Sequence, residues 1–245
     1  MWSLIDPVTL LLASLIIVIG AVTQSLLGFG LAVVSTPLLY IVDPELVPVP
    51  VIILSFSIAL LTLLRERGNL ELGGLQYALA GRIPGSLLGV TLLLAPRAVL
   101  GLIIAAIVGA AVVMSLKKFS VAVTRRNLFI AGAFSGIFGT VAGIGGPPMA
   151  LLLTGREAGK FRAALSAFFM VSTCISLLIL ALSGMVSWRD LLLSVLLLPA
   201  VVLGFLASGI LLPRVDKRRT RLLTLALCGA SALLLALKSL WALLS

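Results

Sequence analysis

The sequence predicts an all-α polytopic membrane protein made of two inverted-topology repeats, each a re-entrant broken-helix hairpin plus three transmembrane helices. Three observations lead to this prediction: apolar runs of membrane-spanning length, two glycine clusters at equivalent positions in the two halves, and the distribution of Lys and Arg. Of the 245 residues, 61% are hydrophobic and 11% are charged, and the mean hydropathy is +1.29. Because about 20 apolar residues cross the hydrocarbon core as a helix, we expect essentially no soluble domain.

The first half of the chain, residues 1–118, begins with two apolar segments that flank the glycine cluster "LLGFGL". Segment 8–27 is long enough to cross a bilayer, but segment 31–42 is too short. We expect the two to form one hairpin over residues 8–42 that enters and leaves the membrane by the same face. Polar breaks then separate three further apolar segments, which are predicted to be transmembrane helices 47–64, 72–95 and 98–116.

The second half, residues 125–245, repeats this order of segments. Segments 127–142 and 147–155 flank the cluster "GIGGPP", so a second hairpin is expected over residues 127–155. Transmembrane helices are predicted to follow at 163–183, 190–212 and 222–244. At one offset of 115 residues, landmarks of the two halves coincide: Gly28 with Gly143, Gly30 with Gly145, Pro84 with Pro199 and Gly89 with Gly204. This common offset predicts two copies of one structural unit.

The distribution of Lys and Arg distinguishes between two possible topologies. If residues 127–155 cross the membrane, eight Lys and Arg lie on one side and nine on the other, which gives no orientation signal. If these residues re-enter, 14 of the 18 lie on one side, Arg97, Arg189 and Lys238 lie on the other, and Arg82 lies within a predicted helix. The positive-inside rule favours the second arrangement. Each half then crosses three times, so the second copy is inverted, and both termini are predicted to be periplasmic.

The two glycine clusters predict an anion site. A helix break at membrane depth survives only where protein or a wet cavity surrounds it, and helix N-termini attract anions through free N–H groups and the helix dipole. Glycines also let a ligand approach the backbone closely. The alternative is that the glycines only allow close helix packing. The candidate donors are the backbone amides of Gly28, Phe29, Gly30 and Leu31 in the first half and of Gly143, Ile144, Gly145 and Gly146 in the second.

A few polar side chains near these breaks are further candidates. Arg82 is the one basic residue well inside an apolar run, and buried arginines usually face the bundle interior or water. Its alternative role is to anchor a helix end. The uncharged candidates are polar side chains that either bind the anion or satisfy freed backbone groups: Gln24, Ser25, Thr36 and Thr140.

Other function classes fit the composition less well. The chain has no histidine, its acidic residues lie near segment ends, and its two cysteines are far apart. An intramembrane enzyme or a cation transporter would require such groups at membrane depth, so no metal or cofactor is expected. Basic loops explain the net charge of +10 better than nucleic-acid binding does. An anion permease and an anion channel both remain open, as do a monomer and a homodimer.

Three stretches carry a family resemblance: "SLLGFGLAVVSTPLL", "GIFGTVAGIGGPPMALLL" and "GRIPGSLLG". They resemble the TauE/SafE sulfite exporter-like permeases over the whole chain. The first stretch departs from the glycine-rich form, because Leu31 stands where the second half has Gly146. The resemblance implies a multi-pass protein of the bacterial inner membrane that transports a small sulfur-containing anion, such as sulfite or an organosulfonate, outward. A negative cell interior drives anions outward by about 2.3 kcal/mol per charge per 100 mV, so we expect potential-driven efflux.

Overall fold

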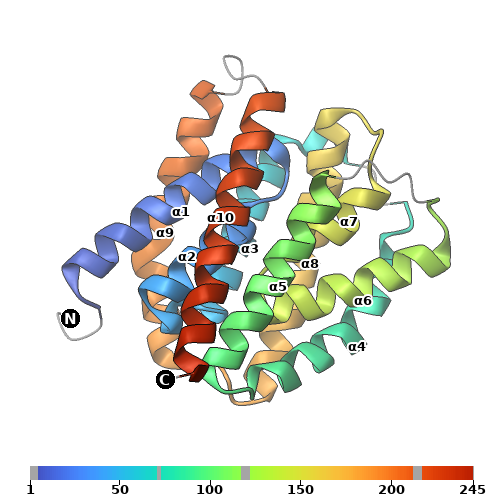
Figure 1. The fold of residues 1–245 in the computed structure, drawn as a ribbon. Coiled ribbons are helices and arrows are strands. Elements are labelled where there is room, and N and C mark those ends of the chain that lie inside the picture. Colours follow the sequence, from blue (N-terminus) through green and yellow to red (C-terminus); the bar gives the residue numbers. More distant parts are fainter. Residues whose placement is uncertain (1–4, 71–72, 117–121, 212–216, 245) are drawn as a thin grey trace.

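The computed structural model describes residues 5–70, 73–116, 122–211 and 217–244, and these residues form a bundle of α-helices with two short 3-10 turns (Figure 1). The all-α prediction is therefore confirmed. The predicted basic-loop residues Lys117, Lys118 and Arg214 lie outside the described part of the chain.

The first half begins with a capped helix. The Asp6 carboxylate accepts hydrogen bonds from the backbone N–H groups of Val8 and Thr9, which satisfies donors that a helix start leaves unpaired. Pro7 occupies the first turn, where its missing N–H has no cost. The elements of this half are α1 (Pro7–Leu27), α2 (Leu31–Val42), η1 (Pro44–Leu46), α3 (Val49–Arg65), η2 (Arg67–Asn69), α4 (Leu75–Leu93) and α5 (Arg97–Leu116).

The second half contains α6 (Arg125–Ala142), α7 (Gly146–Leu152), α8 (Ala158–Leu182), α9 (Trp188–Leu211) and α10 (Lys217–Leu244). The largest departures from the predicted bounds are at the starts of α8 and α10, which lie five residues before the predicted residues 163 and 222. Each predicted segment began directly after a basic residue, Arg162 or Arg221. A helix continues past the hydrocarbon boundary because its backbone hydrogen bonds do not depend on apolar side chains.

In the part of the chain that the structure describes, five helices are long and apolar enough to cross a membrane: α1, α5, α8, α9 and α10. Helix α3 is shorter, with 17 residues. Helix α4 has 19 residues, but Arg82 and three glycines lower its hydropathy. Large apolar side chains cover the outer surface of the bundle, as Leu203 (60% exposed) and Leu223 (73% exposed) illustrate. The chain is thus a multi-pass membrane protein.

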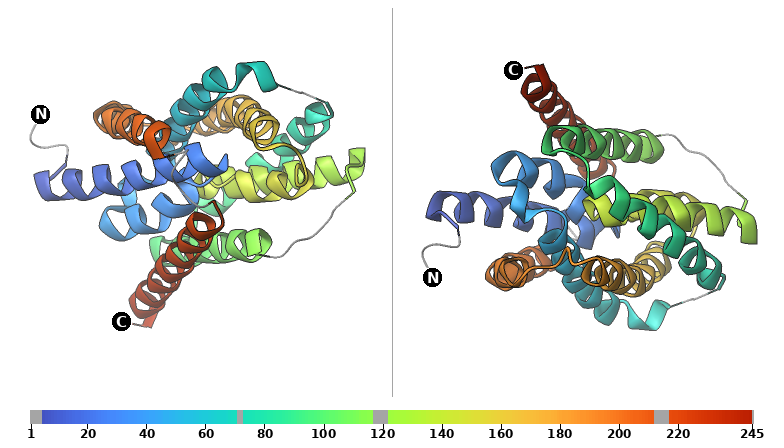
Figure 2. Two further views of the ribbon diagram at one scale, coloured as in Figure 1. Left: turned by 90° about the horizontal axis from the view of Figure 1, so that it is seen from above. Right: turned by 90° about the horizontal axis from the view of Figure 1, so that it is seen from below.

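Helices from the two halves alternate in the bundle. Helix α1 packs against α9, α4 against α6, α3 against α8, and α5 against α10. In the views of Figure 2, α1 and α6 are both seen side-on and extend from opposite sides toward the middle of the molecule, while α9 is seen nearly end-on. The C-terminal ends of α1 and α6, where the glycine clusters lie, therefore meet at the centre.

The packing of α4 on α6 brings the two backbones into direct contact. A Cβ atom added to Gly81, Gly85 or Gly132 would overlap a carbonyl group of the facing helix, and one added to Gly136 would lie 2.5 Å from the Arg82 carbonyl oxygen. Small residues allow such close approach between membrane helices. As a result, the Arg82 side chain on α4 lies close to the end of α6.

Candidate functional site

Both glycine clusters interrupt the helices. Helix α1 ends at Leu27 and α2 begins at Leu31, while α6 ends at Ala142 and α7 begins at Gly146. Gly28 (φ +88°), Gly30 (φ +137°) and Gly143 (φ +70°) adopt backbone conformations that side chains with a Cβ rarely take. The chain can therefore leave the α-helix at both points. We refer to residues 28–30 as the first break and residues 143–145 as the second break.

Side chains form hydrogen bonds with some of the backbone N–H and C=O groups that the breaks leave unpaired. The Gln24 side-chain carbonyl accepts the Leu31 N–H at 3.1 Å. Thr36 on α2 donates its hydroxyl to the Ala142 carbonyl oxygen at the end of α6, at 2.6 Å. This second bond joins the two breaks directly, because its donor follows the first break and its acceptor precedes the second. Backbone satisfaction is thus the role of both side chains in this structure.

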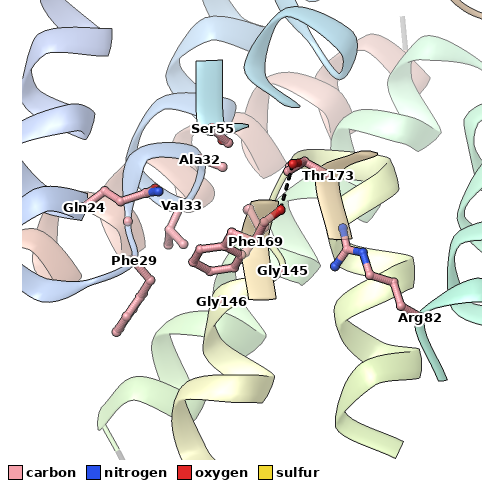
Figure 3. Close-up of a pocket in the computed structure, with 13 residues that line it drawn as sticks. Gln24, Phe29, Ala32, Val33, Ser55, Arg82, Gly145, Gly146, Phe169 and Thr173 are labelled. Atoms are coloured by element: carbon pink, nitrogen blue, oxygen red, sulfur yellow. Dashed lines mark hydrogen bonds between the residues drawn. The ribbon is translucent and has the colours of Figure 1, made fainter. Parts of the chain in front are cut away.

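A cavity of about 20 Å³ lies between the two breaks (Figure 3). Its lining comes from five regions of the chain that are far apart in sequence: the first break with the end of α1 and the first turn of α2, the second break with the first turn of α7, and helices α3, α4 and α8. The residues around it are Gln24, Phe29, Gly30, Ala32, Val33, Ser55, Arg82, Gly143, Ile144, Gly145, Gly146, Phe169 and Thr173.

Several residues that line this cavity have unpaired backbone donors. Four of the predicted donors are already used: the amides of Gly28, Leu31, Gly143 and Ile144 donate to oxygens of α1 or α6. Six other N–H groups around the cavity have no hydrogen-bond acceptor among the described residues: those of Phe29, Gly30, Ala32, Val33, Gly145 and Gly146. Helix starts leave such donors free, and they favour anions.

Arg82 supplies the positive charge of the site. Its side chain is 1% exposed. Nε donates to the Ser172 carbonyl at 2.9 Å, Nη1 to the Ser135 carbonyl at 2.9 Å and to Ser135 Oγ at 2.7 Å, and Nη2 to Ser176 Oγ at 3.0 Å. Every acceptor that Arg82 has within the described chain is a neutral oxygen. A buried charge without an opposite charge is costly, so a bound anion would complete this arrangement.

Two serines connect Arg82 to the second break and to the end of α6. Ser135, which accepts from Arg82, donates its own hydroxyl to the Gly145 carbonyl at 2.7 Å. Ser176 lies 3.0 Å from the Thr140 hydroxyl, oxygen to oxygen. Gly145 leaves the necessary space, since an added Cβ would lie 2.8 Å from both Arg82 Nη1 and Ser135 Oγ. The second break, the serines and the arginine thus form one packed unit.

The cavity lining also includes a hydroxyl and two aromatic rings. Ser55 on α3 is 6% exposed, and its Oγ has no hydrogen-bond partner in the described part of the chain. Phe29 and Phe169 both approach Gly146, where an added Cβ would lie 2.8 Å from Phe29 Cβ and 3.0 Å from Phe169 Cζ. These rings narrow the cavity, and Ser55 provides a further group for hydrogen bonding.

The structure brings together most of the candidates that the sequence indicates, but not all. Eight of them line the cavity: Gln24, Phe29, Gly30, Arg82, Gly143, Ile144, Gly145 and Gly146. Five do not: Ser25, Gly28, Leu31, Thr36 and Thr140. The hydroxyls of Ser25 and Thr140 instead bond Ser208 and Ser176.

Sequence reasoning missed five lining residues, namely Ala32, Val33, Ser55, Phe169 and Thr173. Small polar and aromatic residues are too frequent in membrane helices to attract attention singly. Among the described residues, no three His, Cys, Asp or Glu side chains gather in a way that could hold a metal ion.

Comparison with known proteins agrees with the resemblance seen in the sequence. No curated protein and no solved structure matches the chain. The family model described as sulfite exporter TauE/SafE matches residues 12–235, which include both breaks and Arg82. That family implies a membrane exporter or permease for sulfite or a related sulfur anion. The chain therefore belongs to the TauE/SafE sulfite exporter family.

Proposed function

We propose that this protein is an inner-membrane transporter that exports a small sulfur-containing anion, sulfite or an organosulfonate, and binds it near the membrane midplane between the two breaks. One observation carries the proposal. Residues of both breaks whose amides are unpaired line one cavity together with Arg82, a buried cation bonded only to neutral oxygens in the described chain. Amide donors and an unbalanced positive charge together favour a ligand of negative charge.

The neighbour relations support two inverted repeats, residues 1–118 and 125–245. If the hairpin α1–α2 corresponds to α6–α7, then α3, α4 and α5 correspond to α8, α9 and α10. The contact of α1 with α9 is then equivalent to that of α6 with α4, and the contact of α3 with α9 to that of α8 with α4. The pairs α3–α8 and α5–α10 then lie across the symmetry axis, as expected for related halves.

Helix geometry supports a site at half depth. Ser55 on α3 and Thr173 on α8 line the cavity. Glu66, directly after the last residue of α3, forms an ion pair with Arg162 near the start of α8. Ser55 precedes Glu66 by eleven residues, and Thr173 follows Arg162 by eleven residues. In a helix this separation corresponds to about 16 Å at about 1.5 Å per residue. This distance is about half of the roughly 30 Å hydrocarbon core.

The size of the cavity favours a carrier over an open channel. A volume of about 20 Å³ suffices for about one water molecule, so a sulfonate group requires Phe29 and Phe169 to move apart. A site that must open for its ligand suits alternating access. The membrane potential drives a monovalent anion outward, by about 2.3 kcal/mol per 100 mV.

The test uses the purified protein in liposomes. Efflux of methanesulfonate or sulfite is measured while a potassium gradient with valinomycin sets the potential, and the dependence on anion concentration is recorded. We expect saturable flux that rises as the compartment holding the anion becomes more negative. Flux that ignored the potential would exclude potential-driven efflux, and flux that never saturated would indicate a channel.

A matched pair of variants tests the site. Arg82→Gln removes the buried charge, and Arg126→Gln removes an exposed charge at the start of α6. We expect Arg82→Gln to abolish saturable transport and Arg126→Gln to retain it. Equal transport by both variants would mean that the anion binds away from Arg82.

A further inference from the structure

A buried ion pair links the C-terminal end of α3 to the beginning of α8. Arg162 Nε donates to Glu66 Oε1 at 2.8 Å, and Arg162 Nη2 lies 2.6 Å from the same oxygen. Both residues are at most 9% exposed. Glu66 Oε2 accepts from Asn69 Nδ2 at 3.1 Å, and Arg65 Nε lies 3.9 Å from Glu66 Oε1. Both carboxylate oxygens therefore accept hydrogen bonds, and the cluster of Arg65, Glu66 and Arg162 carries a net positive charge.

This cluster lies directly against the first break. An added Cβ on Gly28 would be 3.2 Å from Arg162 Cγ and 3.3 Å from the Phe161 ring. Arg65 Nη2 donates to the Ser25 carbonyl at 2.8 Å, near the end of α1. The backbone of residues 28–30 thus touches the cluster on one side and lines the anion cavity on the other. Opening of the pair would expose the first break on the side that faces the cluster.

Buried hydroxyls lie between the ion pair and the cavity. Thr62 is one helical turn from Glu66 on α3, and Ser166 is one turn from Arg162 on α8; they are 0% and 1% exposed. Thr62 Oγ1, like Ser55 Oγ, has no hydrogen-bond partner among the residues described. Unpaired buried hydroxyls are uncommon and costly, and a spacing of seven residues places Ser55 and Thr62 on one face of α3. Their hydroxyls would be satisfied by a passing anion or by water.

We propose that α3 and α8 line the inner half of the anion route, that Thr62 and Ser166 are contact residues on it, and that the Glu66–Arg162 pair is its gate. The proposal rests on the proposed function for the direction and charge of the solute. The anion replaces Glu66 as the acceptor of Arg162, while Asn69 and Arg65 retain the Glu66 carboxylate. Arg162 thereby exchanges the Glu66 carboxylate for the transported anion and keeps a negatively charged partner throughout.

The experiment measures access to Thr62 with a thiol probe. Thr62→Cys is placed in a protein whose Cys174 and Cys228 are replaced by alanine, and inside-out vesicles are treated with 2-sulfonatoethyl methanethiosulfonate. Adding Glu66→Gln keeps the side-chain shape and removes the charge that holds Arg162. We expect about tenfold faster labelling, the change in open population that corresponds to about 1.4 kcal/mol. The trimethylammonium analogue of the probe should react more slowly, because the route selects anions.

A lipid-facing position provides the matched control. Leu64 is two residues further along α3 and 57% exposed, so the labelling of Leu64→Cys should not respond to Glu66→Gln. If Thr62→Cys also failed to respond, the ion pair would not be a gate. If Glu66→Gln did not yield folded protein, Arg162→Lys is the second variant. It keeps the charge but loses one of the two contacts with Glu66 Oε1, and an intermediate labelling rate is expected.

The result is separable from the proposed function. Faster labelling of Thr62→Cys on loss of the Glu66 charge supports the gate even where methanesulfonate is not transported. Protection of Thr62→Cys by methanesulfonate in the Glu66→Gln background supports the anion route. Unchanged labelling together with intact methanesulfonate flux would overturn the gate and leave the transporter assignment standing.

Discussion

Replacing Gly145 by alanine tests the second break as a part of the anion site. The backbone of Gly145 is helical, with φ −88° and ψ −7°, so alanine fits without a backbone change. The new methyl group would lie 2.8 Å from Arg82 Nη1 and from Ser135 Oγ, well inside ordinary van der Waals contact. Any effect therefore arises from displacement of these two side chains.

The magnitude follows from the bonds that the methyl group displaces. Ser135 Oγ accepts from Arg82 at 2.7 Å and donates to the Gly145 carbonyl at 2.7 Å. A hydrogen bond to a charged group contributes about 1.5–3 kcal/mol. If Arg82 no longer holds its position, the affinity for the anion should fall roughly 10- to 150-fold.

Thermal unfolding with and without methanesulfonate measures this loss. At a ligand concentration of about 100 Kd, binding stabilises the wild-type protein by about 2.7 kcal/mol. With the weakened affinity, the same concentration should stabilise Gly145→Ala by only about 0.3–1.4 kcal/mol. Gly109→Ala is the control, because an added Cβ there meets no described atom within 4 Å apart from the backbone of its own helix. Full stabilisation of Gly145→Ala by methanesulfonate would refute a role for the Arg82–Ser135–Gly145 unit in binding.

Three further variants separate the architecture from the site. Thr36→Val leaves the Ala142 carbonyl without its 2.6 Å hydrogen bond. Because an unsatisfied buried group costs about 1–3 kcal/mol, the variant should unfold at a lower temperature, while methanesulfonate should still stabilise it. Gly85→Ala places a methyl group on the Ala133 carbonyl; overpacking of about 1–3 kcal/mol or more should lower the unfolding temperature in detergent. Arg82→Lys keeps the charge, but one ammonium cannot reach the three serines that the guanidinium contacts, so titration with methanesulfonate should show binding that is weaker than wild type and stronger than in Arg82→Gln.

Two conservative variants serve as references for the stability measurements. Gly209→Ala adds a methyl group that meets no described atom within 4 Å apart from the backbone of its own helix. Thr91→Val removes an exposed hydroxyl that donates to the Leu88 carbonyl of its own helix. Both should unfold close to the wild-type temperature. If Gly85→Ala behaved like Gly209→Ala, the contact between the α4 and α6 backbones would not limit stability. If Thr36→Val behaved like Thr91→Val, the bond between the two breaks would be dispensable.

The helices were predictable because lipid makes hydropathy a direct signal. The observed α2, Leu31–Val42, has the predicted bounds, since glycines precede it and Asp43 follows it. The start of α8 was predicted too late because Lys160 and Arg162 interrupt the apolar pattern, yet the helix continues through them. Hydropathy locates the hydrocarbon boundary, whereas helix ends depend on backbone hydrogen bonding beyond that boundary.

The site was predictable only where a residue is exceptional for its surroundings. Arg82 and the glycine clusters are conspicuous in apolar segments, and the structure places them at one cavity. Ser55 and Thr173 became candidates only through packing, because a single hydroxyl in a membrane helix is common. The individual partners of Thr36 and Thr140 likewise depend on contacts over more than 30 residues of sequence, which no local pattern encodes.

The central claim is that an anion binds between the two breaks, and anomalous diffraction tests it most directly. Crystals of a variant with Cys174 and Cys228 replaced by alanine would be soaked with selenite, the selenium analogue of sulfite. We predict a selenium peak between the first and second breaks, with its oxygens within hydrogen-bond distance of the Gly30 and Gly146 amides. A peak elsewhere in the bundle, or none in crystals of a protein that transports sulfite, would contradict this account.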